Sequence, residues 1–148
     1  MKLIKAKNQT EIFTVVYIRK DVFINEQNVD VNEELDGRDI LADHFLVKDN
    51  NKYVATARVY YENDTAIIGR VAVLKSYRNS GYAKFMLKNI ISILKENKNL
   101  KTVHLGAQVQ AQGFYEKLNF KVSGDLYLDA NIEHYPMELK LWNYPQNM

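Results

Sequence analysis

The stretch from Ile67 to Leu94 constrains the fold more than any other part of the chain. An apolar run from Ile67 to Leu74 is followed by a short polar segment and then by Gly81, after which apolar residues recur at helical spacing. This order predicts a strand, a turn and an amphipathic helix. The first N–H groups of a helix lack intrahelical partners and lie at the positive end of its dipole. A glycine there lets an anion approach the backbone, so the stretch predicts either a phosphate site or an ordinary turn into a core helix.

The remaining hydrophobic patterns predict a mixed fold around this unit. Expected strands span 2–5, 44–47, 52–61, 65–74, 102–105, 120–128 and 135–142; expected helices begin after Asn8 and at Gly81 and span 111–118. The first helix is expected because apolar residues recur near 3.6-residue spacing, at Ile12, Val15, Val16, Ile18, Val22 and Phe23. We expect residues 25–43 to be loop with at most a helical turn, and Asn119 to end its helix in the left-handed conformation. The order predicts a single α/β domain over 1–142, with helices on both faces of a mixed sheet and a loose tail at 143–148.

Composition excludes several classes of protein. The chain of 148 residues has no cysteine, so disulfides, thiolate metal sites and a cysteine nucleophile are excluded. The net charge of +2 is too small to indicate nucleic acid. No apolar run suggests a signal peptide or a membrane span, and we expect a cytoplasmic protein. Asp36, Asp39, Asp43 and His44 lack a regular ligand spacing, so we predict no metal site.

Charge is divided between two segments. Residues 26–43 hold seven acids and one base, a net charge of −6, and residues 75–101 hold seven bases and one acid, a net charge of +6. Such runs are commonly solvated faces. The alternative is that the basic segment attracts an anionic ligand and the acidic segment a cationic one.

Several motifs occur together in the order found in one protein family. They are Arg19-x-x-Val22-Phe23-x-x-Glu26-Gln27, Glu34-x-Asp36-x-x-Asp39 with His44, Ile68-Gly69-Arg70-Val71-Ala72-Val73, Arg78-x-x-Gly81-x-Ala83, Ala107-Gln108 with Phe114-Tyr115-Glu116-Lys117-Leu118-Asn119-Phe120, and Asn131-Ile132-Glu133-His134-x-x-Met137. In these segments the chain resembles the GNAT acyltransferase superfamily, in particular its YjcF-like and ElaA-like bacterial branch. Asn119, Asn131 and Glu133 depart from the family pattern, in which glycine, glycine and proline are usual.

The resemblance implies the GNAT fold, with a mostly antiparallel sheet, and acetyl-coenzyme A as the acyl donor. In this family the fourth strand separates from the fifth, and the pantetheine arm pairs with it. The implied coenzyme A contacts are the backbone of Val71, Ala72 and Val73, the loop residues Arg78, Asn79, Ser80, Gly81, Tyr82, Ala83 and Lys84, and Gln108, Phe114 and Lys117.

The resemblance also implies N-acetyltransfer to an amine by direct attack in a ternary complex. Tyr115 is the candidate acid that returns a proton to the leaving thiolate. The candidate bases for the amine are Glu26, Glu34, Asp36, His44 and His134, and no spacing selects among them. The implied acceptor contacts are Glu26, Asp36, Asp39 and His44, and we expect a small-molecule or peptide amine that is cationic before it loses its proton. The alternative is a non-catalytic acyl-coenzyme A sensor on the same fold. We expect no nucleic-acid or membrane partner, and a homodimer stays open.

Overall fold

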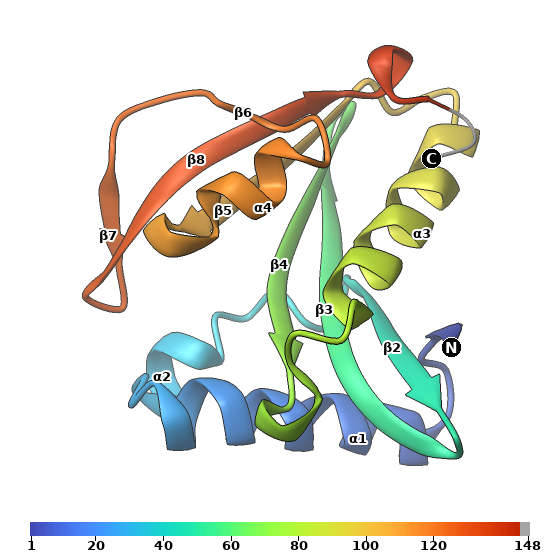
Figure 1. The fold of residues 1–148 in the computed structure, drawn as a ribbon, viewed down its shortest axis with the longest axis vertical. Coiled ribbons are helices and arrows are strands. Elements are labelled where there is room, and N and C mark those ends of the chain that lie inside the picture. Colours follow the sequence, from blue (N-terminus) through green and yellow to red (C-terminus); the bar gives the residue numbers. More distant parts are fainter. Residues whose placement is uncertain (146–148) are drawn as a thin grey trace.

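The computed structural model describes residues 1–145 as one sheet with helices against it (Figure 1). The strands run in the order β1-β2-β3-β4-β5-β8-β6, and β7 pairs with β8. All neighbours are antiparallel except β4 and β5, which are parallel. The strands are β1 (Lys2–Lys5), β2 (Asp43–Asp49), β3 (Lys52–Glu62), β4 (Thr65–Val73), β5 (Thr102–Gln108), β6 (Lys121–Val122), β7 (Tyr127–Asp129) and β8 (Ile132–Lys140). The α-helices are α1 (Gln9–Arg19), α2 (Val31–Glu34), α3 (Tyr82–Glu96) and α4 (Gln112–Glu116). The predicted mixed, mostly antiparallel sheet is confirmed.

Helices cover both faces of the sheet, as the sequence predicts. Side chains alternate along β2, where Phe45 and Val47 join the core under α3 and α4, while Leu46 joins a smaller core under α1. The helix α3 buries Met86, Leu87, Ile90, Ile91 and Leu94 against the larger core. The two layers therefore hold the strands between them.

The first helix starts as predicted but buries only some of its regularly spaced apolar residues. The Asn8 side chain accepts a hydrogen bond from the backbone N–H of Glu11 at 2.8 Å, and the Glu11 carboxylate accepts from the backbone N–H of Asn8 at 3.2 Å. This capping box confirms Asn8 as the N-cap. Val15, Ile18 and Val22 are buried, whereas Ile12 and Val16 are 36% and 51% exposed, so the spacing alone does not identify the buried face. A π-helical segment, Lys20–Glu26, continues the helix into residues that were expected to begin a loop.

Two boundaries near the C-terminus also differ from the prediction. The single strand expected over 120–128 is divided into β6 and β7. A 3-10 turn, Leu141–Asn143, follows β8, and the next residue, Tyr144, is buried in the larger core. Packed structure therefore extends past residue 142, and residues 146–148 of the expected tail lie outside the described residues.

The strands β4 and β5 separate in the middle of the sheet. Their pairing begins at Thr65 opposite Thr102 and ends at Ile68 opposite Leu105, although both strands continue further. Figure 1 shows the two strands diverging from this point. The second half of β4 keeps β3 on one edge, and its other edge faces the opening.

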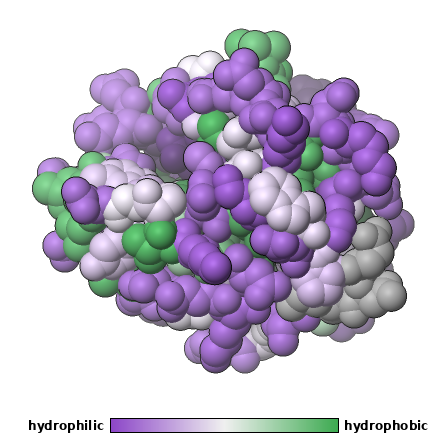
Figure 2. Space-filling model, turned by 90° about the horizontal axis from the view of Figure 1, so that it is seen from above, coloured by the Kyte–Doolittle hydropathy of each residue, from purple (hydrophilic) through white to green (hydrophobic). Residues whose placement is uncertain are grey.

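The surface seen from above in Figure 2 is mainly hydrophilic, and its apolar residues form small separate patches. Within residues 1–145 no helix combines the length and the apolar character needed to cross a membrane.

Candidate active site

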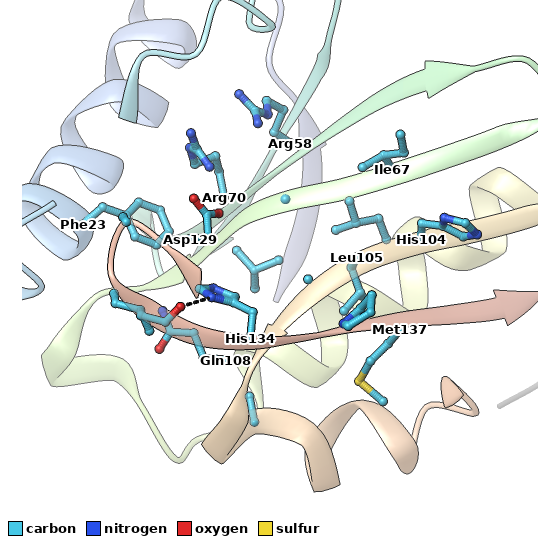
Figure 3. Close-up of a pocket in the computed structure, with 18 of the residues that line it drawn as sticks. Phe23, Arg58, Ile67, Arg70, His104, Leu105, Gln108, Asp129, His134 and Met137 are labelled. Carbon is cyan, nitrogen blue, oxygen red and sulfur yellow. Dashed lines mark hydrogen bonds between the residues drawn. The ribbon is translucent and has the colours of Figure 1, made fainter. Parts of the chain in front are cut away.

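A cavity of about 710 Å³ lies where β4 and β5 separate. Its walls come from the end of the first helical segment, from α2, β3, β4 and β5, from the first turn of α3, from α4 and from the β7–β8 hairpin. Figure 3 shows Arg58, Arg70 and Asp129 toward one side of this space, Ile67 and Met137 toward the other, with His134 between them. The volume lies within the range of small-molecule sites in proteins.

The N-terminus of α3 forms one end of the cavity. Gly81 is the N-cap in the left-handed conformation, with φ of +85°, and no side chain caps the helix there. The first intrahelical bond runs from the N–H of Phe85 to the Gly81 carbonyl at 3.0 Å. The N–H groups of Tyr82, Ala83 and Lys84 precede this bond, so the helix leaves them for an external acceptor.

The loop before α3 is tied to the first helical segment. The guanidinium of Arg78 donates two hydrogen bonds to the Glu26 carboxylate, at 2.8 and 2.9 Å, and its Nε donates to the Val73 carbonyl at 2.9 Å. The predicted phosphate ligand and a predicted acceptor contact thus form one ion pair. Both side chains are part-exposed, so this pair can exchange with a competing anion at small cost.

A bulge in β4 turns backbone groups toward the opening. Gly69 and Ala72 of β4 pair with Arg58 and Thr56 of β3, so β4 has one residue more than β3 between these two pairs. The extra residue, Arg70, has a φ of +51°. Beyond the bulge, the N–H of Leu74 donates to Val54 on β3 at 3.0 Å. Since neighbouring residues of an extended strand direct their backbone groups to opposite edges, the N–H of Val73 faces the opening.

Tyr115 reaches the cavity from α4. Its ring is packed edge-on between Phe114 and Phe120, with centroids 5.1 and 5.9 Å away. The residue is only 7% exposed and lines the cavity. Burial raises the pKa of the Tyr115 phenol to about 12, so the hydroxyl keeps its proton at neutral pH.

His134 lines the cavity from β8. Its Nδ1 lies 2.7 Å from the carbonyl oxygen of Ile132, drawn as the dashed line in Figure 3. A carbonyl can only accept, so Nδ1 carries the proton and the neutral ring keeps its lone pair on Nε2. A β-carbon built on Gly106 would lie 3.8 Å from Cδ2 of His134, so the Cδ2–Nε2 edge of the ring faces the separated part of β5.

Glu34 is held in a buried ion pair. Its carboxylate accepts two hydrogen bonds from Arg19, both at 2.9 Å, and lies 2.9 Å from Nε of Arg70. The Glu34 side chain is 5% exposed and that of Arg19 is 3% exposed. Burial lowers the pKa of Arg19, but hydrogen bonds to Asp39 and Glu34 outweigh this and raise it. A buried carboxylate paired in this way stabilises the fold, so we do not retain Glu34 as the candidate base.

The neighbouring carboxylates are paired in the same way. Asp36 accepts two hydrogen bonds from Arg58 at 2.8 Å and one from Arg70 at 3.3 Å, while Asp39 accepts from Arg19 at 2.7 Å and from Arg58 at 3.1 Å. Burial raises the pKa of Asp36, but the bonds from Arg58 and from the backbone N–H of Arg38 prevail and lower it to about 2. Both carboxylates therefore stay charged beside buried arginines.

These pairs change the interpretation of the acidic segment. Of its seven acids, Glu34, Asp36 and Asp39 pair with Arg19, Arg58 or Arg70, Glu26 pairs with Arg78, and Asp43 pairs with Lys5. The arginines that balance the first three lie outside residues 26–43. The segment is thus largely neutralised by the rest of the fold, which removes the electrostatic basis for expecting a cationic acceptor.

Comparison with known proteins assigns the chain to a family. A family model described as an acetyltransferase (GNAT) domain matches residues 21–141. The chain belongs to the GNAT acetyltransferases. Two relatives from Bacillus subtilis (strain 168) support this: the uncharacterized protein YyaT is 34% identical, covering 90% of this chain and 92% of YyaT, and the uncharacterized N-acetyltransferase YjcF is 33% identical, covering 93% and 98%. The predicted resemblance is confirmed.

Solved structures share the fold. The crystal structure of Escherichia coli ElaA has a TM-score of 0.84 and 25% identity, covering 93% of this chain and 99% of ElaA. A crystal structure of an aminoglycoside 6′-N-acetyltransferase complexed with coenzyme A has a TM-score of 0.76 and 12% identity, covering 98% of this chain and 99% of the other.

This GNAT domain gathers part of the predicted site around its cavity. The predicted residues that line it are Glu34, Asp36, Val71, Ala83, Gln108, Phe114, Tyr115 and His134. Ala72 and Val73 continue β4 beside it, and Arg78, Asn79, Ser80, Gly81, Tyr82 and Lys84 form the loop and first turn at the α3 end. Lys117 is exposed just past α4. Glu26, Asp39 and His44 are not among the lining residues; Nε2 of His44 instead lies 2.9 Å from the Asp39 carbonyl.

Sequence reasoning missed several lining residues of this GNAT domain. Arg58 lies on β3 and carries no local motif, although an arginine within a valine-rich strand is a signal of a buried ion pair. Tyr127 and Gly106 lie on different strands, and no spacing along the chain links them.

Proposed function

We propose that this protein is an acetyltransferase that moves the acetyl group of acetyl-coenzyme A to an amine by direct attack in a ternary complex. The observation that carries the proposal is the cavity at the separation of β4 and β5, which has the N-terminus of α3 at one end and is lined by both Tyr115 and His134. Membership of the GNAT family supports an acyl-coenzyme A-dependent N-acyltransferase role. The acyl donor supplies the activated thioester, and the protein positions it.

The residues at the α3 end suit the phosphates of coenzyme A. The N–H groups of the first turn are available, and Gly81 adopts a conformation that residues with a β-carbon rarely take. When coenzyme A binds, Arg78 would release Glu26 and bind a phosphate, or it would stay paired with Glu26 and hold the loop in place. The coenzyme A complex of a structure with the same fold supports this placement.

The pantetheine arm would lie along the open edge of β4. The N–H of Val73 faces that edge, and the same alternation continues to Val71 next to the bulge. A backbone N–H at this position can stabilise the charge that develops on the thioester oxygen. Gln108, Phe114 and Lys117 would contact the coenzyme on the β5 and α4 side.

Two proton transfers complete the reaction. The attacking amine must lose a proton, and Nε2 of His134 has the free lone pair that can accept it, directly or through one water. The departing thiolate needs a proton, and the Tyr115 hydroxyl keeps one at neutral pH. The acceptor is an amine of a small molecule or a peptide, and the paired acids beside the cavity shape its pocket rather than supply free negative charge.

The test measures thiol release from acetyl-coenzyme A with a panel of amines, together with the dissociation constant of coenzyme A by calorimetry. His134→Asn can still donate to the Ile132 carbonyl but lacks the base, and Tyr115→Phe lacks only the hydroxyl. Each should lower kcat by about 10²–10⁴-fold with little change in affinity for coenzyme A. Tyr17→Phe is the matched control, because Tyr17 is 67% exposed on α1.

Two outcomes would contradict the proposal. Tight coenzyme A binding without acyl transfer to any amine would favour the alternative of a non-catalytic sensor. Unchanged turnover in both variants, where chemistry limits the rate, would remove His134 and Tyr115 from the mechanism.

A further inference from the structure

The side chain of Tyr127 crosses from β7 to the separated part of β5. Gly106 is the first residue of β5 after its pairing with β4 ends. A β-carbon built on Gly106 would overlap the hydroxyl oxygen of Tyr127 and would lie 3.4 Å from the ring carbon Cζ. The hydroxyl therefore occupies the space that any other residue at position 106 would fill, and only glycine lets Tyr127 lie in this place.

Tyr127 also covers one face of His134. The two residues are opposite each other in the β7–β8 ladder, and their rings are stacked with centroids 5.6 Å apart and planes 25° apart. This is the offset geometry that aromatic pairs prefer. The ring of His134 is thus held by a stack on one face and by the bond from Nδ1–H to Ile132, at 2.7 Å.

We infer that Tyr127 is a positioning residue for His134, a role that rests on the proposed function of His134 as the base. The missing side chain at Gly106 leaves room for Tyr127 to reach across β5, and the stack then sets the plane of the imidazole. With Nδ1 directed at its own strand, this plane keeps Nε2 toward the opening between β4 and β5, where the amine must attack. The hydroxyl of Tyr127 determines only which residue fits at position 106, whereas the ring of Tyr127 holds the orientation of the His134 imidazole.

This inference differs from two simpler explanations in what it predicts. If Tyr127 only filled space in the hairpin, its loss would change stability but not the protonation pattern of His134. If Gly106 were required only for close approach of the acyl donor, replacing it would be harmful whatever residue stands at position 127. Both explanations can be tested separately.

The first experiment needs no acceptor and no turnover. The protein has three histidines, so ring-labelled ¹⁵N-histidine gives three sets of signals, and those of His134 are identified by their loss in His134→Asn. At a pH where the ring is neutral, wild type and Tyr127→Phe should show the Nδ1–H tautomer of His134, and Tyr127→Ala should show both tautomers. Leu128→Ala, a change at an exposed neighbour on the same strand, should match wild type. A single unchanged tautomer in a folded Tyr127→Ala would overturn the inference.

The second experiment uses acyl transfer and a designed rescue. Gly106→Ala should displace Tyr127 and lower kcat by at least about tenfold, part of what positioned acid–base groups contribute, with little change in KM. In Gly106→Ala/Tyr127→Phe the overlapping oxygen is gone and the nearest ring carbon lies at ordinary contact distance, so kcat should return to within about threefold of that of Tyr127→Phe. A double variant as slow as Gly106→Ala alone would overturn the inference.

The two experiments separate this inference from the proposed function. If wild type transfers no acetyl group while Tyr127→Ala mixes the tautomers of His134, the proposed function fails and the positioning of His134 stands. If wild type is active and neither the tautomer nor the rescue behaves as expected, only the positioning role fails.

Discussion

Glu34 offers a direct test of whether the acidic segment is structural. Glu34→Gln keeps the shape of the side chain but removes the charge that faces Arg19 and Arg70. In the wild type the carboxylate accepts both bonds from Arg19 at 2.9 Å and lies 2.9 Å from Nε of Arg70. Since the Arg19 side chain is 3% exposed, water cannot replace the lost partner.

The expected loss follows from this burial. Removing one member of a buried pair typically costs about 3–5 kcal/mol, because the other charge is left uncompensated. Arg19 keeps its bond to Asp39 at 2.7 Å, and the amide oxygen can still accept one bond, so we expect the lower end, about 3 kcal/mol. For a domain of this size that lowers Tm by roughly 6–12 °C.

Urea unfolding and thermal melts would measure the change. Glu33→Gln is the matched control, because Glu33 is exposed on the same short helix, and it should stay within about 0.5 kcal/mol of wild type. If the two variants lose equal stability, or if Glu34→Gln is neutral, then Glu34 is not held as described. A stable Glu34→Gln that lost only acyl transfer would restore Glu34 as the base.

Three further outcomes are expected. The pKa of Asp36 is about 2 in the fold against 3.8 in the unfolded chain, so its carboxylate stabilises the fold above pH 4, and this contribution is lost as the pH falls toward 2. Asp36→Asn should therefore flatten the decline of the unfolding free energy between pH 4 and pH 2, which urea melts at several pH values would measure. Tyr144→Ala should lower the free energy of unfolding by about 3 kcal/mol, because the residue is 2% exposed. The control Trp142→Ala, at a position that is 66% exposed, should change it by less than about 0.5 kcal/mol. Equal losses in the two variants would place Tyr144 outside the core. Gly81→Val should weaken coenzyme A binding by more than about tenfold, or 1.4 kcal/mol, and calorimetry on a folded variant with unchanged affinity would remove the α3 N-terminus from the binding site.

Much of the fold could be predicted because its signals are local. The helix α3 is specified by apolar residues on one face, and it begins within one residue of the predicted start at Gly81. Asn119 has a φ of +74°, as its position after a short helix predicts. Ile12 and Val16 share the helical spacing but are exposed, because α1 presents only a narrow stripe to the sheet and spacing alone does not distinguish an exposed apolar residue.

The candidate site was predictable to the extent that it depends on motifs. The turn at Gly81 and the box containing Tyr115 could be identified from neighbouring residues, and the structure brings Ala83, just after that turn, and Tyr115 to one cavity. Glu34 was a plausible base in the sequence because a carboxylate shows no sign of its partner. Its partners Arg19 and Arg70 lie 15 and 36 residues away, so only the folded chain shows that the charge is already balanced.

By itself, the sequence determined most of the order of helices and strands up to α4, the cap at Asn8 and the turn that opens α3, because each depends on interactions within a few residues. Only the tertiary structure decided how charges are paired and where β4 and β5 separate. It also decided that Tyr127, from a short strand near the end of the chain, lies over Gly106 and against His134. The physical reason is that these contacts join segments whose distance in space is set by packing of the whole sheet, and no residue pattern along the chain records that distance.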